Sequence, residues 1–371
     1  MRRFDYLDRF AFVIHPLSVG DVSRKFKFAR RLPDSWVEAA LRLLPPLKTA
    51  EITGVRSEHN EVAGWFISCP LTTRQIMSLD PDYVLQKVIQ TGKRAEKLGA
   101  RILGLGAFTK VVGDAGISVA KALDIPVTTG NSYTIATAIQ GAREAARLMG
   151  HNLAEAEVAV VGAAGAIGSV CARILAREAK RMTLVGRNQQ KLELVADSIL
   201  ADCGLAARIT SDLAGALRRA DVVVTVTSAV DTIIEPEHLK PGAVVCDVAR
   251  PRDVSRRVVE VRDDVLVIEG GVVEVPGPVD FHLNFGFPPR MAYACMAETM
   301  ILALEKRFES FTLGRELTVR QVEEIAALAE KHGFKMAGFR SFERAVSPEE
   351  IARIAENARR RLDKGEGAHY N

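Results

Sequence analysis

Short apolar runs recur along the first part of the chain, at intervals typical of strands in an α/β protein. Such runs stand at residues 10–14, 51–55, 62–68 and 101–105. Between the last two, residues 81–98 form an amphipathic helical pattern in which Val84, Leu85, Val88 and Ile89 share one face. This alternation predicts a small N-terminal α/β domain, followed by a short strand at 126–128 and a helix at 135–149.

A second and more regular series of apolar runs begins at residue 158. The predicted strands lie at 158–161, 182–185, 207–210, 221–229, 243–249 and 265–271, with a helix at 191–200. The longer runs consist largely of Val and Ile without polar alternation, which is what strands buried on both faces require. We therefore expect a Rossmann domain built on a doubly wound parallel sheet.

The pattern changes again after Gly277 and Pro278, where helices dominate. A long helix is predicted from Arg290 to about residue 308, with Cys295 and Glu298 beside its apolar line, and another at 319–332. A last helix begins with a capping signature of Ser, Pro and Glu at 347–350. The predicted organisation is an N-terminal α/β substrate domain (1–145), a Rossmann domain (146–280) and a C-terminal helical region carrying Cys295 (281–371).

The run at 158–161 leads into a turn with Gly162, Gly165 and Gly168, which opens a helix. Backbone at such a helix start approaches a pyrophosphate only where side chains are absent, and its N–H groups and dipole then hold the anion. Ala163 stands where the usual spacing has its first glycine, so the spacing alone also fits a tight turn in a parallel sheet. The strand before and the helix after favour a dinucleotide site.

The end of the second strand of this series indicates which dinucleotide binds. An acidic residue there would hold the ribose of NAD, whereas Arg187 suits a 2′-phosphate and favours NADPH. The longer strands end in small or polar residues, so that the cofactor can lie across the strand ends. The predicted cofactor-binding residues are Gly162, Gly165, Ala166, Ile167, Gly168, Arg187, Asn188, Thr227, Ser228 and Ala229.

Composition narrows the class of protein. Hydrophobic residues make up 48% and charged residues 26%, the balance of a soluble globular protein, and a net charge of +4 is too small to indicate nucleic-acid binding. Charged residues interrupt every apolar run before membrane-spanning length, and the five cysteines lack metal-ligand spacing. We expect a cytoplasmic protein with reduced thiols, no metal and no transmembrane segment. The sequence does not indicate the oligomeric state.

Two polar segments each fit two interpretations. The basic segment at 23–31, with Lys25, Lys27, Arg30 and Arg31, fits a solvated helix face or a docking patch for an acidic partner. The hydroxyl-rich turn at 128–134 follows a strand end, where α/β sheets place ligands, and also fits a cluster that caps the next helix. If it binds substrate, the candidate residues are Thr129, Asn131, Ser132 and Tyr133.

The cysteines are candidates for a nucleophile, since a thiolate can take an acyl group from a carrier thioester. Cys171 in a helix and Cys246 in a buried strand fit the core, whereas Cys203 lies in a polar connection and Cys69 precedes a proline. Cys295 follows the dinucleotide domain, where a second domain can present it to the nicotinamide. Position alone does not choose among them. The predicted helix start at residues 288–290 is too far from Cys295 for its dipole to help the thiol ionise.

Three motifs together carry a resemblance to a known family. They are Thr-Thr-Gly-Asn-Ser-Tyr-Thr at 128–134, the glycine turn at 162–168 and Tyr-Ala-Cys-Met-Ala-Glu at 293–298. With 311–315 and 331–334, they resemble the long-chain fatty acyl-(acyl carrier protein) reductases of the bacterial alkane pathway, from about residue 15 to 335. The resemblance implies that Cys295 carries the acyl group, delivered by acyl carrier protein or CoA, and that NADPH reduces it to a fatty aldehyde. Tyr133 departs from the family, which carries histidine there.

A second resemblance covers the Rossmann half alone. Residues 221–229 and 247–253 are similar to glutamyl-tRNA reductase and shikimate dehydrogenase domains. The first would need an N-terminal nucleophile, where only Cys69 is present, and the second a lysine–aspartate pair, for which Lys110 and Asp114 are candidates. Acyl-thioester reduction is therefore the expected function. The alternatives are an NADP-dependent shikimate- or quinate-type dehydrogenase acting on a small polar substrate and a non-catalytic NADPH-binding sensor.

Overall fold

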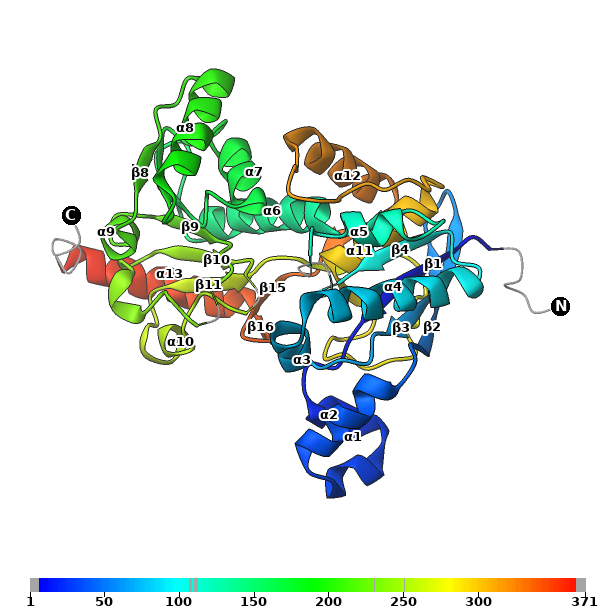
Figure 1. The fold of residues 1–371 in the computed structure, drawn as a ribbon. Helices are drawn as coiled ribbons and strands as arrows, with labels where there is room; N and C mark the ends of the chain where they lie inside the picture. Colours follow the sequence, from blue (N-terminus) through cyan, green and yellow to red (C-terminus); the bar gives the residue numbers. More distant parts are fainter. Residues whose placement is uncertain (1–6, 107–108, 110–112, 230, 250, 365–371) are drawn as a thin grey trace. The chain divides into compact units, whose positions relative to one another are not determined.

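The computed structural model describes residues 7–106, 109, 113–229, 231–249 and 251–364 (Figure 1). The chain folds into two compact units, each assembled from separate stretches of sequence. Unit 1 comprises Met1–Tyr133, Val273–Glu316 and Glu324–Lys335, and unit 2 comprises Thr134–Val272, Leu317–Glu323 and Met336–Asn371. The predicted domains are three continuous segments with boundaries at residues 145 and 280. Each of the two observed units instead combines an earlier part of the chain with part of its C-terminal quarter.

Unit 1 is built on a five-stranded sheet of order β2-β3-β1-β4-β5. Its strands are β1 (Arg9–Ile14), β2 (Leu47–Arg56), β3 (Glu61–Ser68), β4 (Ile102–Leu105) and β5 (Val127–Thr128). All are parallel except the edge strand β2, which forms the predicted hairpin with β3. The helices that follow β3 and β4 are α3 (Thr73–Ser78), α4 (Pro81–Lys97) and α5 (Ile117–Lys121).

Helices cover both faces of this sheet (Figure 1). Ala11 and Val13 of β1 pack in the core formed with α4, as the period of two along a strand requires. Phe12 lies on the opposite face, beside Thr299 of α11 (Ala294–Leu304). Every described residue of α11 except Cys295 is buried, which explains why its sequence is apolar nearly all round.

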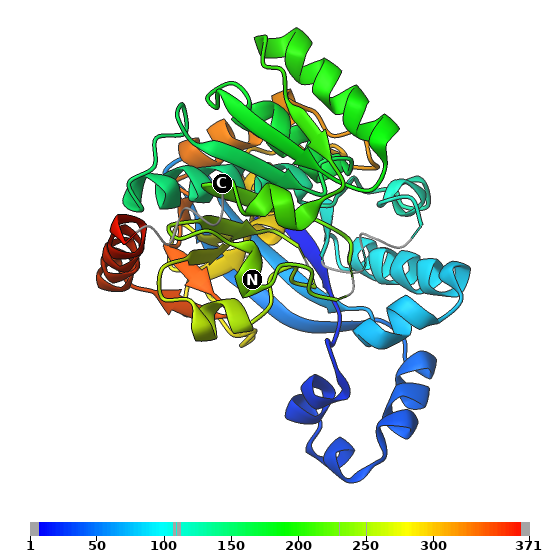
Figure 2. The same ribbon diagram turned by 90° about the vertical axis from the view of Figure 1, so that its left-hand side faces the viewer.

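A small helical lobe, residues 19–43, separates β1 from β2. It comprises α1 (Val19–Lys25), the short 3-10 helix η1 (Lys27–Arg31) and α2 (Asp34–Leu43). These helices project from the sheet of unit 1 in both views (Figures 1 and 2). The lobe has a minimal core of its own, made of Val19, Ala29, Val37 and Leu41.

Unit 2 contains a six-stranded parallel sheet of order β8-β7-β6-β9-β10-β11. The strands are β6 (Glu157–Val161), β7 (Arg181–Val185), β8 (Arg208–Thr210), β9 (Val222–Thr225), β10 (Val244–Asp247) and β11 (Leu266–Glu269). The helices along this stretch are α6 (Asn131–Leu148), α7 (Ala166–Leu175), α8 (Gln189–Cys203), α9 (Leu213–Leu217), η3 (Pro236–His238) and α10 (Arg257–Val261). This strand order is that of a dinucleotide-binding Rossmann fold, so the predicted α/β class is confirmed.

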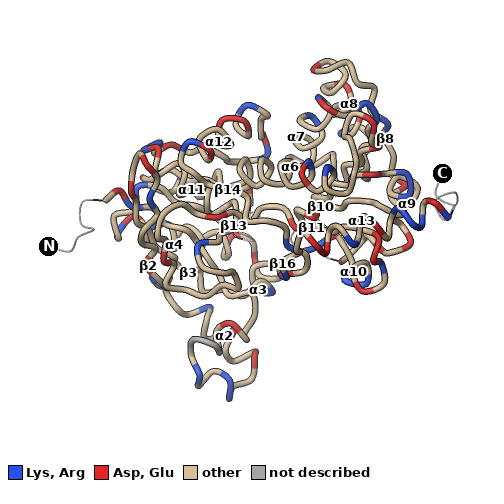
Figure 3. The backbone as a smooth tube through the Cα atoms, turned by 180° about the vertical axis from the view of Figure 1, so that it is seen from behind, with Lys and Arg blue, Asp and Glu red and all other residues tan. Residues whose placement is uncertain are grey.

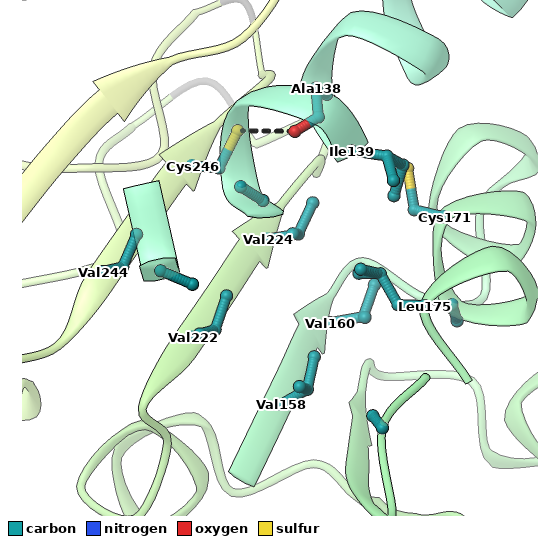
Figure 4. Packing of buried hydrophobic residues seen from close by; sticks show 14 of the residues in the cluster. Ala138, Ile139, Val158, Val160, Cys171, Leu175, Val222, Val224, Val244 and Cys246 are labelled. Carbon is teal, nitrogen blue, oxygen red and sulfur yellow. Dashed lines mark hydrogen bonds between the residues drawn. The ribbon is translucent and has the colours of Figure 1, made fainter. Parts of the chain in front are cut away.

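The central strands of unit 2 are apolar on both faces, as their Val-rich runs predict. Val158 and Val160 point into one apolar cluster, and Ala159 and Val161 into another on the opposite face. Figure 4 shows the first cluster, where the strand side chains meet α6 and α7; the Cys246 thiol there donates to the carbonyl oxygen of Ala138 at 3.6 Å. Since helices cover both faces, polar alternation along these strands is unnecessary.

The C-terminal part of the chain contributes to both units. Its elements are β12 (Val272–Glu274), β13 (Met291–Tyr293), α11, α12 (Val319–Lys331), β14 (Lys335–Met336), the hairpin of β15 (Phe339–Ser341) and β16 (Arg344–Val346), and α13 (Pro348–Asp363). The helix predicted from Arg290 to about residue 308 is wrong at both ends. Residues 291–293 pair as a strand with β12, which keeps their backbone extended, and α11 begins only at Ala294. No helix among the described residues is long and apolar enough to cross a membrane.

Candidate active site

Cys295 is the second residue of α11. The helix follows Tyr293, which caps it without a side-chain hydrogen bond, so the first-turn N–H groups and the positive end of the dipole lie beside the thiol. Such a position favours a thiolate. The expectation that the helix starts too far away to help is therefore wrong, because it rested on the misplaced start at residues 288–290. Cys295 is also partly exposed.

The turn after β5 lies against the backbone of Cys295. Gly130 has a left-handed φ of +73°, and a Cβ atom at this position would lie 2.3 Å from Cys295 Cα and 2.4 Å from its Cβ. No side chain fits in that space, and residues other than glycine rarely adopt this backbone conformation. Gly130 therefore allows the turn to approach the start of α11 closely.

A buried carboxylate ties this turn to α11. Glu298, one helical turn after Cys295, is fully buried. It accepts hydrogen bonds from Thr128 Oγ1 at 2.5 Å, from Thr312 Oγ1 at 2.8 Å and from the Tyr133 N–H at 2.9 Å. Because a buried carboxylate is costly without such donors, the three bonds fix the turn, the helix and the segment around Thr312 to one another.

The four candidate substrate residues are all part of this turn. Asn131 opens α6, and Asn131, Ser132 and Tyr133 are largely buried, so the segment begins a helix and also contributes to the Cys295 surroundings. Ser132 Oγ lies 3.1 Å from Thr312 Oγ1. Burial raises the pKa of the Tyr133 phenol, which stays protonated at neutral pH.

Of the four residues, Thr129 has the side chain best placed to contact a ligand. Its backbone N–H donates to the carbonyl oxygen of Thr312 at 2.9 Å, which places it firmly in the turn. Its hydroxyl oxygen is buried and has no hydrogen-bond partner within the described part of the chain. A buried polar group of this kind, next to Gly130, is available to a bound ligand.

The remaining cysteines differ from Cys295 in burial. Burial raises the pKa of the Cys69 thiol to about 11 and that of the Cys171 thiol to about 12, and Cys246 is buried inside β10. Cys203 is exposed but is the last residue of α8, at the negative end of that helix. Cys69 is thus a poor nucleophile, which removes the N-terminal thiol that a glutamyl-tRNA reductase mechanism would use.

The glycine turn in unit 2 follows β6, between the strands where the sheet order reverses. A Cβ on Gly162, whose φ is +82°, would lie 2.9 Å from the Val226 carbonyl oxygen, and one on Gly168 would lie 2.3 Å from that of Gly162. Gly165 is the N-cap residue of α7, and no side chain caps the first N–H groups of that helix. The turn therefore brings bare backbone and an open helix N-terminus to the crevice where such sheets bind dinucleotides, and the chain fits the predicted cofactor.

The other predicted cofactor residues lie at the ends of neighbouring strands. Arg187 is exposed after β7, and the Asn188 side chain accepts from the Lys191 N–H at 3.0 Å as the cap of α8. After β9, the Thr227 hydroxyl donates to Asp253, and the Ala229 N–H donates to Thr227 Oγ1 at 3.1 Å. Ala166 and Ile167 form the first turn of α7, and Ser228 stands between Thr227 and Ala229.

Asp253 braces the loop after β9, a role that the sequence pattern does not reveal. It is fully buried and accepts from Thr225 Oγ1 at 2.5 Å and from the Thr227 N–H at 2.9 Å. Asp247 similarly accepts from the backbone of Ala249 and Val254, at 3.0 and 3.1 Å. Asp247 is the first and Asp253 the last residue of the 247–253 motif. This spacing of two acidic residues is the sequence feature that could indicate a loop held by hydrogen bonds.

An aromatic row also escaped the sequence analysis. Phe66 of β3 contacts Phe281 and Phe285, Phe285 contacts Phe287, and Phe287 contacts Tyr293, with ring centroids 4.6–6.1 Å apart. Tyr293 immediately precedes α11 and stands two residues before Cys295. Apolar residues at 281, 283, 285 and 287 alternate with polar residues or glycine, which is the pattern of a strand. The segment forms no regular strand, so that pattern does not predict the contacts between the rings.

The structure describes only one residue of the candidate lysine–aspartate pair of a shikimate-type site. Asp114 accepts hydrogen bonds from the Ser118 N–H at 2.8 Å and the Ser118 hydroxyl at 2.7 Å, in the first turn of α5. Lys110 lies outside the described residues. Among the described His, Cys, Asp and Glu side chains, no group of three or more is arranged to hold a metal ion.

The sheet order and the glycine turn define unit 2 as an NADP(H)-binding Rossmann domain of the oxidoreductase class. Residues 143–269 match the family described as shikimate / quinate 5-dehydrogenase. The chain is homologous to a long-chain acyl-[acyl-carrier-protein] reductase of Synechococcus elongatus, with 28% identity covering 85% of this chain and 94% of that protein. The resemblance predicted from the three motifs is confirmed.

Two further relatives are named for other activities. The aminotransferase PigE of Serratia sp. is 31% identical over 93% of this chain, which spans only 42% of PigE. The glutamyl-tRNA reductase of Cyanothece sp. is 25% identical over 47% of this chain and 41% of its own length. This partial match agrees with the second resemblance.

Helix position and burial predict the order of thiol reactivity. At pH 8, iodoacetamide should modify Cys295 about tenfold faster than Cys203, although Cys203 is more exposed, because their helix ends have opposite polarity. Cys69 and Cys171 should stay unmodified. Time-resolved peptide mapping measures the rates, and labelling in guanidinium chloride should make all five equal. Rapid labelling of Cys69 in the folded protein would contradict the assignment.

Gly130→Ala tests the close approach of the turn to Cys295. The variant should lose at least about 2 kcal/mol more unfolding free energy than Gly99→Ala, because overpacking adds to backbone strain. Gly99 is the matched control, with φ of +85° and nothing within 4 Å of an added Cβ. Urea unfolding of both variants measures the difference, and equal losses would show that the contact with Cys295 is unimportant.

Proposed function

We propose that the protein is an NADPH-dependent reductase that converts a long-chain acyl thioester into a fatty aldehyde through an acyl-Cys295 intermediate. The observation that carries the proposal is the position of Cys295, partly exposed in the first turn of α11 and braced by the turn containing Gly130. The homologous acyl-[acyl-carrier-protein] reductase supports the same substrate class. Acyl carrier protein or CoA would deliver the acyl group.

The first chemical step belongs to Cys295. Its thiolate, favoured by the helix N-terminus, attacks the thioester carbonyl, and the carrier leaves as a thiol after taking a proton. The acyl group is then held on Cys295 as a new thioester. Glu298 is a positioning residue in this step, because its three hydrogen bonds hold the neighbouring turn rather than the reacting sulfur.

The second step reduces the acyl-enzyme. NADPH, when bound, supplies the hydride. The carbonyl carbon accepts it, and the oxygen becomes a thiohemiacetal oxyanion on Cys295, which collapses to the aldehyde and returns the thiolate. We assign the Thr129 hydroxyl as a donor to this oxyanion, because it is buried beside Gly130 and makes no other hydrogen bond in the described structure. The Thr227 hydroxyl is already directed to Asp253.

The cofactor-binding role is assigned to the ends of β6, β7 and β9. Gly162, Gly165 and Gly168, with Ala166 and Ile167, would hold the pyrophosphate at the start of α7. Arg187 and Asn188 would border the adenosine ribose, with Arg187 facing its 2′-phosphate. The backbone at 227–229, braced by Asp253, would border the nicotinamide half.

The aromatic row fits an acyl chain better than a small polar substrate. Phe285 and Phe287 are only partly buried, so their rings offer apolar surface close to Tyr293 and the start of α11. Burying a methylene group against such surface contributes about 0.8 kcal/mol. We therefore place the acyl chain along this row.

Intact-mass measurement tests the covalent step. Incubation with a long-chain acyl thioester without NADPH should add one acyl mass, and Cys295→Ala should abolish both this adduct and aldehyde formation. Cys203→Ala is the matched control and should retain both. NADPH added to the acylated protein should remove the adduct and release aldehyde. Aldehyde formation at wild-type rate by Cys295→Ala would overturn the proposal.

Arg187→Ala tests the assignment of NADPH to the end of β7. Loss of a charge-assisted hydrogen bond worth about 1.5–3 kcal/mol should raise KM for NADPH roughly 10- to 100-fold and leave KM for NADH unchanged. Steady-state kinetics with both cofactors measure the effect, with the exposed Arg218→Ala as control. A parallel rise in both KM values would contradict a 2′-phosphate contact.

A further inference from the structure

The helix α2 has apolar residues on two opposite faces. Val37 and Leu41 point inward to the small core of the lobe. Trp36 and Leu43, seven residues apart, lie on the outer face with side chains that are 67% and 86% exposed. A surface helix normally carries polar residues on that side, so the outer face is unexplained by folding.

Specific bonds hold α2 in this orientation. The Glu38 carboxylate, on the inner face, accepts from Thr72 Oγ1 at 3.0 Å and pairs with Arg74, and the Gln75 side-chain amide donates to the Glu38 carbonyl oxygen at 2.9 Å. The Tyr83 hydroxyl donates to the Arg42 carbonyl oxygen at 2.9 Å. The outward direction of Trp36 is therefore built into unit 1 and does not reflect a loosely attached helix.

Exposed apolar side chains are unusually frequent in the lobe and the residues that flank it. Of the 15 large apolar side chains that are exposed in the described structure, seven lie between residues 17 and 47, a segment of 31 residues. They are Leu17, Phe26, Leu32, Trp36, Leu43, Leu44 and Leu47. Large exposed apolar patches mark interaction sites.

Basic residues accompany the apolar patch. Lys27, Arg30 and Arg31 of η1 are exposed, and Figure 3 shows Lys and Arg positions at the tip of the lobe. The lobe has three acidic residues: Glu38 is buried against Arg74, Asp21 accepts from the backbone N–H groups of Leu17 and Ser18, and Asp34 is exposed at the start of α2. The lobe thus presents apolar and positively charged groups together.

We propose that the lobe docks on the surface of an anionic phospholipid bilayer. Trp36 and Leu43 would enter the interface between headgroups and acyl chains, and Lys27, Arg30 and Arg31 would pair with lipid phosphates. Each basic residue close to an anionic membrane strengthens the attraction to it. An acidic carrier protein would match the basic residues alone and leave the Trp36 face exposed to water, so the bilayer accounts for more of this surface.

The docking surface does not depend on the proposed active site. Membrane docking would nevertheless affect how the proposed product leaves the enzyme. A long-chain aldehyde is far more soluble in a bilayer than in water. Docking at a membrane would therefore allow an apolar product to partition directly into the bilayer.

Vesicle binding tests this inference without any catalytic readout. Full-length protein should co-sediment with vesicles of phosphatidylcholine and phosphatidylglycerol, about tenfold less with phosphatidylcholine alone, and about tenfold less in 0.5 M NaCl. The chain has two tryptophans, and Trp65 is 5% exposed, so a blue shift of emission on binding reports Trp36. Absence of binding to the anionic vesicles overturns the proposal.

Paired variants locate the surface. Trp36→Ala with Leu43→Ser should reduce vesicle binding at least tenfold, and so should Arg30→Glu with Arg31→Glu. Leu194→Ser and Arg218→Glu, exposed positions in unit 2, are the matched controls and should bind like wild type. Because all these residues are exposed, the variants should keep the wild-type unfolding midpoint and NADPH affinity.

Two other outcomes would reassign the lobe. If acyl carrier protein binds wild type but not Arg30→Glu with Arg31→Glu, while anionic vesicles bind neither, the surface is a carrier site. If sedimentation equilibrium shows a dimer that Trp36→Ala with Leu43→Ser dissociates, without vesicle binding, a second copy of the chain covers the face. Either result overturns membrane docking and leaves the acyl-Cys295 test unaffected.

Discussion

The buried carboxylate of Glu298 is the constraint on which the arrangement around Cys295 depends. Inside a helix that is mostly apolar, a buried carboxyl group needs several hydrogen-bond partners, and two threonine hydroxyls and one backbone N–H supply them. Satisfying that requirement brings the turn after β5 against the first turn of α11, where glycine alone permits the contact. The hydrogen bonds that a buried carboxyl group requires thereby position the residues around the Cys295 thiol.

Unit 2 uses the same physical device at its own loops. Asp253 and Asp247 are buried acids whose acceptors are filled by nearby hydroxyl and backbone groups, and they brace the segments after β9 and β10. Loops at the carboxyl ends of parallel strands are otherwise mobile by default, whereas a binding site needs a defined backbone. The helical lobe uses this device as well, because Glu38 is buried and accepts from Thr72 Oγ1 and from Arg74, whereas Trp36 on the same helix faces outward.

Much of the fold follows from local pattern. Three predicted features depend on interactions between residues close in sequence, and all three are present in the structure. They are the Val-rich strands buried on both faces, the hairpin near residue 60 and the capping signature at 347–350. The start of α11 was misplaced because Pro288 and Pro289 are good first residues of a helix, whereas pairing with β12 keeps residues 291–293 extended. Sheet pairing between distant segments overrode a local signal there.

The sequence by itself determined the class of fold, the glycine turn of unit 2 and the short set of thiols from which a nucleophile had to come. Only the tertiary structure separated those thiols, because burial and helix polarity depend on packing: Cys69 is enclosed, Cys203 ends a helix and Cys295 begins one. The partners of Glu298 come from positions 128, 133 and 312, and the outward face of α2 depends on bonds to residues 72–83. Contacts of such sequence separation leave no periodic pattern along the chain.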